Sequence, residues 1–120
     1  MKSLKLLFSA VLVLVLTACS NNSPADLQNI KVPDVVTYQN TIREIMVNNC
    51  VRCHGTVPTN GSPMSLTTYA NVKDAVLNRG TIDRMNRNPG DGLLMPQGGP
   101  KLPQALIDAV VKWQAQGFQE

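Results

Sequence analysis

The chain is poor in several kinds of residue, and each shortage excludes a class of structure or site. It has a single histidine, His54, so two histidines of one chain cannot ligate the same metal ion. Aromatic residues make up only 4% of the 120 residues. A domain of this length with few large side chains buries a modest core. We therefore expect a cofactor, a metal or a disulfide to add to its stability.

The sequence also has little excess of charge of either sign. The formal net charge is +3, and loss of Lys2 and Lys5 with an N-terminal signal would leave nine basic and eight acidic residues. A nucleic-acid-binding surface needs clustered basic side chains. The five arginines are instead scattered along the sequence, at positions 43, 52, 79, 84 and 87. The composition therefore predicts no nucleic-acid partner, and we interpret these arginines as solvated side chains.

The N-terminal apolar run is too short to span a membrane as a helix, which needs ~20 residues. This run, Leu6–Leu16, is interrupted by Ser9, follows two lysines and leads into Leu16-Thr17-Ala18-Cys19. The pattern is typical of a secretory signal peptide, and its last four residues resemble a bacterial lipobox, in which the cysteine becomes the lipidated first residue. We expect a signal peptide at 1–18, an acylated Cys19 in the bilayer and a polar tether at 19–36. Alternatively, Cys19 is a small residue near an ordinary cleavage site.

The other two cysteines lie in Asn49-Cys50-Val51-Arg52-Cys53-His54-Gly55. C-x-x-C-H is the attachment pattern of haem c. Two thiols add to the two vinyl groups of the porphyrin, and the histidine that follows ligates the iron. Dithiol chemistry is an alternative, but no β-α-β pattern surrounds the pair. Zinc is another, but a structural zinc site usually has four Cys or His ligands. The motif therefore predicts one covalent haem c, held by Cys50, Cys53 and His54.

The sixth iron ligand has four methionine candidates: Met46, Met64, Met85 and Met95. Met95 lies in residues 88–103, where glycines and prolines argue against regular structure. An extended loop of this kind can lie against a porphyrin face. The string M-P-x-G-G-x-x-L, at 95–102, resembles the distal-ligand loop of class I cytochromes c. We predict Met95 as the ligand, with Met85, another ligand or an open position as alternatives.

Helical periodicity is visible at 36–49, 67–78, 82–86 and 103–116, and strand patterns are absent. Thr37 can cap the first helix, Thr67 or Thr68 the second, and Gly80 and Gly117 supply stops. In the last helix, Leu106, Val110 and Trp113 form one stripe, with Ile107, Val111 and Ala115 beside it. Residues 37–118 resemble class I cytochromes c, whose first helix runs into C-x-x-C-H. The resemblance implies an all-α cytochrome c-like domain at 37–120, with about three main helices around one haem.

These expectations favour electron transfer over enzymatic catalysis, because the sequence offers no constellation of acid, base and nucleophile. The protein would face the periplasm of a bacterial cell envelope and meet redox partner proteins at the exposed haem edge, with no small-molecule substrate. The alternatives are a haem-bearing subunit of a larger oxidoreductase complex, and a haem sensor with an open sixth position. We also expect the carbonyl of Pro58 or Pro63 to orient the His54 ring. Tyr69 either bonds a haem propionate or packs in the core.

Overall fold

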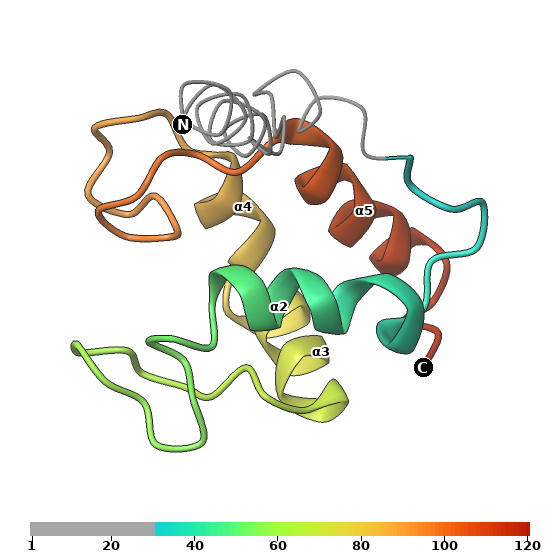
Figure 1. Ribbon diagram of the computed structural model, residues 1–120, viewed down its shortest axis with the longest axis horizontal. Helices are drawn as coiled ribbons and strands as arrows, with labels where there is room; N and C mark the ends of the chain where they lie inside the picture. Colours follow the sequence, from blue (N-terminus) through green and yellow to red (C-terminus); the bar gives the residue numbers. More distant parts are fainter. Residues whose placement is uncertain (1–30) are drawn as a thin grey trace, which may run out of the picture.

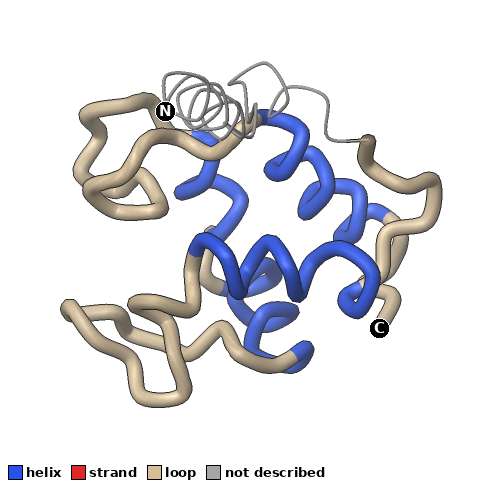
Figure 2. Tube along the Cα trace, in the orientation of Figure 1, coloured by secondary structure: helices blue, strands red, loops and turns tan. Residues whose placement is uncertain are grey.

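Residues 31–120 are described by a computed structural model, and their regular structure is entirely helical (Figure 2). This confirms the all-α prediction for the described part of the chain. A π-helical turn, η2 (Tyr38–Ile42), continues into α2 (Arg43–Asn49); α3 (Tyr69–Asn78), α4 (Thr81–Asn86) and α5 (Gln104–Ala115) follow. No helix within 31–120 is both long and apolar enough to cross a membrane. The predicted signal peptide and Cys19 lie outside the described residues.

The first helical element begins where the sequence predicts, at Thr37. The Thr37 side chain accepts a hydrogen bond from the Asn40 N–H, while the Asn40 side chain accepts one from the Thr37 N–H. This reciprocal capping box satisfies two backbone donors that a helix start leaves without partners. At the other end, the Asn49 side-chain amide donates to the Ile45 carbonyl (2.8 Å). The element therefore delivers the chain to Cys50 in a defined orientation.

The helices α3 and α4 are joined through Gly80, which adopts a left-handed conformation with a φ of 65°. Thr68 caps α3 by accepting from the Asn71 N–H. Thr81 begins α4, and its hydroxyl donates to the Ala75 carbonyl (2.8 Å). A glycine is favoured between the two helices because it adopts positive φ without a Cβ penalty. This tight connection fixes α4 against the end of α3.

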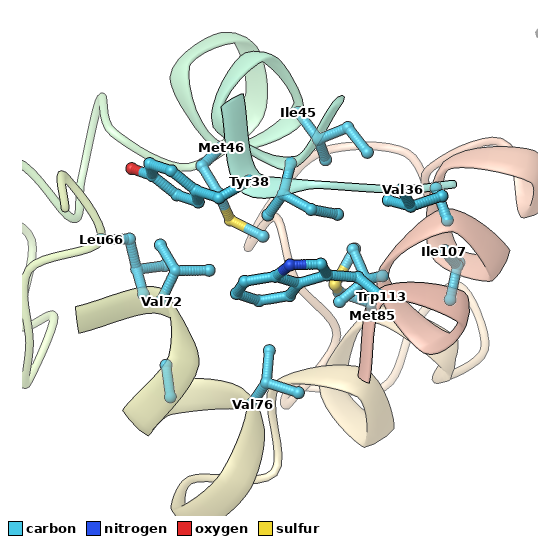
Figure 3. Close-up of a cluster of buried hydrophobic side chains, with 14 of the residues drawn as sticks. Val36, Tyr38, Ile45, Met46, Leu66, Val72, Val76, Met85, Ile107 and Trp113 are labelled. Carbon is cyan, nitrogen blue, oxygen red and sulfur yellow. The ribbon is translucent and has the colours of Figure 1, made fainter. Parts of the chain in front are cut away.

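The hydrophobic core centres on Trp113 of α5, which is completely buried (Figure 3). Its indole N–H donates to the Gln119 carbonyl (2.7 Å), so the polar edge of the ring is satisfied. Of the three residues expected beside the apolar stripe of this helix, Ile107 is fully buried, whereas Val111 is 42% exposed and Ala115 is exposed as well. The core unites the helices: Ile42, Ile45, Met46, Val72, Ala75, Val76, Met85, Ile107, Ala109, Val110 and Trp113 are all buried.

Two long loops project from the same side of the helices (Figure 1). One follows α2 and the other connects α4 to α5. The segment before η2 lies on the other side of the molecule, where Lys112 donates to the Pro33 carbonyl (2.8 Å) and Gln116 to the Asp34 carbonyl (2.7 Å). Packing of this segment on α5 starts before Thr37, since Val36 is fully buried.

Candidate functional site

A cavity of about 700 Å³ lies between the two loops. Its lining includes all four residues that the sequence predicts as haem ligands or attachment points: Cys50, Cys53, His54 and Met95. The attachment segment (residues 50–66) forms one side, and the methionine loop (residues 88–102) contributes the other together with α4. The volume falls within the range of ~300–1,000 Å³ that is usual for cofactor pockets.

The C-x-x-C-H motif is held by a turn that continues from the end of α2. The Cys50 N–H donates to the Met46 carbonyl (2.8 Å), and the Cys50 carbonyl accepts from the N–H groups of Cys53 (3.1 Å) and His54 (2.9 Å). A Cβ added at Gly55 would come within 3.2 Å of the Val51 carbonyl, so glycine suits this close approach. These backbone bonds hold the turn, and the side chains of Cys50, Cys53 and His54 all line the same cavity.

His54 is fastened at three points and is only 8% exposed. Its N–H donates to the Cys50 carbonyl, and its own carbonyl accepts from the Leu66 N–H (2.8 Å). Its ring nitrogen Nδ1 lies 2.9 Å from the Met64 carbonyl. A carbonyl can only accept, so Nδ1 carries the proton, and in the neutral ring Nε2 keeps its lone pair. The expectation that Pro58 or Pro63 orients the ring is wrong, because the loop brings the Met64 carbonyl to Nδ1 instead. An imidazole oriented in this way can ligate a metal through Nε2.

The two thiols of the motif are partly buried and form no disulfide. Burial, with a smaller contribution from the negative charge that Cys53 can carry, raises the pKa of Cys50 to about 11. Thiol exchange needs the thiolate, so this environment disfavours dithiol chemistry at Cys50. Within residues 31–120, no three His, Cys, Asp or Glu side chains gather into a group that could hold a metal ion. The zinc alternative therefore lacks a donor set in the described part.

Met95 reaches the cavity from the methionine loop. Its N–H donates to the Arg84 carbonyl (3.1 Å) at the end of α4, and the neighbouring Leu94 is buried. Met64 and Met85 also line the cavity, whereas Met46 lies in the hydrophobic core. Met85 is only 2% exposed and belongs to that core as well. Of the three methionines lining the cavity, Met64 comes from the attachment segment that carries His54 and Met85 comes from α4, so Met95 is the one that the methionine loop presents.

The cavity lining is positively charged. Within residues 31–120, Arg52, Arg79 and Arg84 contribute to it, and no aspartate or glutamate does. Arg79 is paired with Asp74 (2.8 Å), which helps to lower the pKa of that carboxyl. Among the described residues, Arg52 and Arg84 form no such pair. The interpretation of all arginines as solvated side chains missed this convergence, although the i, i+3, i+4 spacing of Thr81, Arg84 and Met85 carried a signal for a shared helix face.

Tyr69 does not line the cavity. Its hydroxyl donates to the Phe118 carbonyl (2.8 Å), and its ring packs edge-on against Trp113. Tyr69 is therefore partly buried and packs against the core cluster, in agreement with the core expectation, and its hydroxyl is bound away from the cavity.

No protein-family model matches the chain, and neither the curated proteins nor the solved structures yield a significant match.

Proposed function

We propose that the chain is a membrane-anchored electron carrier of the c-type cytochrome kind, with one haem c in the cavity between the two loops. One observation carries the proposal: Cys50, Cys53, His54 and Met95 come from segments about 40 residues apart, and all of them line the same cavity. Neither loop alone brings these groups together. Their convergence supports a single ligand that needs two thiols, an imidazole and a thioether.

The donor set fits haem c residue by residue. Cys50 and Cys53 would form the two thioether bonds, and His54 Nε2 and the Met95 sulfur would ligate the iron. When bound, the haem supplies reversible one-electron chemistry. A thioether ligand favours the ferrous state relative to more basic ligands and so raises the reduction potential. The Met64 carbonyl keeps the His54 ring in the tautomer that ligation requires.

The charge of the lining also fits. Haem carries two propionate carboxylates, and guanidinium groups bind carboxylates well. Arg52 and Arg84 line the cavity without carboxylate partners in the described part of the chain. A propionate would therefore find an arginine here and no competing acidic side chain. The apolar residues of the lining, Leu66, Met85 and Leu102, would exclude water from the macrocycle.

The membrane anchor rests on the sequence, through the lipobox-like Leu16-Thr17-Ala18-Cys19. The predicted tether at 19–36 would join the domain beside α5, where Lys112 donates to the Pro33 carbonyl, on the side away from the two cavity loops (Figure 1). The cavity edge would then stay accessible to redox partner proteins in the periplasm. Transient electron-transfer contacts are small, so a limited exposed edge is sufficient.

The test is production of the full chain in a bacterium with an intact haem c maturation system. We expect the intact mass to include one haem and the acyl groups on Cys19. The pyridine haemochrome spectrum should be that of haem c, and the ferric protein should show a sulfur-to-iron charge-transfer band. A colourless product with two alkylatable thiols at Cys50 and Cys53 would refute the proposal. Ready binding of carbon monoxide to the ferrous protein would favour the sensor alternative, and co-purification with a catalytic subunit would favour the complex.

A further inference from the structure

The methionine loop is attached to the C-terminal end of α4 by hydrogen bonds that could not be predicted from the loop's sequence. The carbonyls in the last turn of a helix have no partner inside the helix. Two of these carbonyls in α4 are bound by the loop: the Met95 N–H donates to Arg84 (3.1 Å), and the Lys101 ammonium donates to Asn86 (2.9 Å). The position of Met95 is therefore tied to the C-terminal end of α4.

A third connection runs through Arg87, the residue directly after α4. Its guanidinium binds the Asp83 carboxylate, one turn back in the helix, through Nε (3.0 Å) and Nη2 (2.9 Å). It also binds the Asp91 carboxylate in the loop through Nη1 (3.0 Å). One arginine thus joins an acidic residue of the helix to an acidic residue of the loop. The geometry is planar and directional, which a lysine would not reproduce.

Asp91 also shapes the loop that leads to Met95. Its second carboxylate oxygen accepts from the Leu93 N–H (2.8 Å), and its carbonyl accepts from the Leu94 N–H (3.0 Å). A side chain that bonds the backbone two residues on is an Asx-turn, which sets the direction of the chain. The bond from Leu93 and the Arg87 guanidinium lower the pKa of the Asp91 carboxyl, so it is charged at neutral pH. Asp91 therefore connects the Arg87 contact directly to the approach to Met95.

We propose that Asp91, held by Arg87, is a positioning residue that presents Met95 to the cavity. The inference rests on the proposed function, in which Met95 is the sixth iron ligand. Asp91 would not touch the haem. It would act by keeping the loop closed on α4, so that the thioether stays at the iron and exogenous ligands are kept out.

The place where the loop is attached explains how the exposed Arg87–Asp91 pair can position Met95. Isolated pairs between exposed side chains contribute little to global stability. Here the pair lies across the joint between a helix and an otherwise irregular loop, and local opening of a loop takes far less free energy than global unfolding. Loss of the pair should therefore change the rate of loop opening much more than the stability of the fold.

The chain offers a matched control for this proposal. Asp83 and Asp91 both bind Arg87, but Asp83 lies within α4 and has no bond to the loop. Asp83→Asn and Asp91→Asn remove the same charge from the same arginine. Asp91→Asn can retain the side-chain oxygen that accepts from Leu93, whereas Asp91→Ala removes both bonds. The three variants therefore form a graded series of loop attachment.

The experiment measures two properties of the mature full-length variants. The first is the rate constant for imidazole binding to the ferric protein, which requires displacement of the Met95 thioether. The second is hydrogen exchange of the Met95 amide by NMR in the ferrous state, which reports the bond to Arg84. We expect the imidazole rate constant to rise about tenfold in Asp91→Ala and roughly threefold in Asp91→Asn, and to stay within about twofold of the parent in Asp83→Asn. The urea midpoints of Asp91→Asn and Asp83→Asn should agree, since a merely structural role would shift midpoint and rate together.

The same rates in Asp91→Ala, Asp91→Asn and Asp83→Asn would overturn the inference. Failure of the proposed function looks different. If the parent protein has no haem, or no sulfur-to-iron band, Met95 is not the ligand and the imidazole measurement loses its meaning. The Met95 amide still reports whether Asp91 holds the loop, because its bond to Arg84 does not involve the haem.

Discussion

The two sides of the cavity are built in different ways. On the attachment segment, His54 is 8% exposed and Leu66 is 3% exposed, and backbone bonds within 50–66 fix the motif. On the methionine loop, Met95 is partly exposed, and side chains such as Arg87 and Lys101 hold the loop at the surface. The contacts around His54 are buried and local, whereas the Arg87 and Lys101 contacts near Met95 are exposed, so the loop around Met95 should open more readily than the turn that carries His54.

This difference suits the roles that we propose for the two sides. Covalent attachment of a cofactor happens once and needs thiols in fixed positions, which the turn after α2 supplies. A single thioether ligand can detach and return without loss of the cofactor. The protein would therefore keep the haem through the rigid side and control access to the iron through the loop.

The strongest test of the rigid side is removal of its thiols. Cys50→Ser combined with Cys53→Ser should abolish covalent haem completely, because both thioether bonds are lost. Cys19→Ser is the matched control among the three cysteines: it should keep one haem and lose the acyl groups. Intact-mass analysis of both proteins measures the two masses. Covalent haem in the double variant would remove the basis of the comparison.

The strongest test of the loop side is Met95→Ala. We expect the sulfur-to-iron charge-transfer band to vanish and the sixth position to bind carbon monoxide readily, while the covalent haem remains. Met85→Ala is the control, since Met85 also lines the cavity but belongs to the packed core. It should lose stability and keep the band. Absorption spectra of the ferric proteins decide between them, and a band that disappears in Met85→Ala alone would reassign the ligand.

One leucine on each side allows the packing to be compared directly. Leu66 is 3% exposed and Leu94 is 5% exposed, but only Leu66 belongs to the main core cluster. Truncation of a core leucine leaves a cavity that the surroundings cannot fill, at about 2–4 kcal/mol. We expect Leu66→Ala to lower the free energy of unfolding by that amount and Leu94→Ala by roughly 1 kcal/mol. Urea unfolding of the mature proteins measures both, and equal losses would contradict the contrast between the two sides.

The helices could be predicted from the sequence because local signals define them. Thr37, Thr68 and Gly80 act through neighbours within a few residues, and the structure uses each of them at a helix boundary. Val111 shows the limit of this approach. It lies near the apolar stripe of α5, but burial depends on what covers that side, and within residues 31–120 Val111 stays 42% exposed.

The residues of the site also differ in how far the sequence predicts them. The C-x-x-C-H motif names its own residues, whereas the partner of the His54 ring is a carbonyl ten residues further on. Any of several backbone carbonyls in that loop has the same chemistry, so composition cannot select Met64 over Pro58 or Pro63. The role of Asp91 is hidden for the same reason, because its connection to Met95 depends on the three-dimensional path of the loop.

The smallest expected effect is a difference in pH dependence between the two sides. The pKa of Asp91 is lowered in the folded protein, so its contribution is present above the ordinary carboxyl pKa of ~3.9 and is lost as the pH falls through the lower folded value. The imidazole probe is itself protonated below pH ~6.5 and only its neutral form binds iron, so the rate constant is expressed per neutral imidazole. On that basis it should be flat at neutral pH and rise by less than about fivefold below pH ~4, as the ion pair with Arg87 is lost. Asp83→Asn is the matched comparison, because it leaves Arg87 paired with Asp91 alone. Asp91→Asn should start from a higher rate constant and show no such rise. A rise of equal size in Asp91→Asn would mean that protonation of another group opens the site, and it would contradict the assignment of this pH dependence to Asp91.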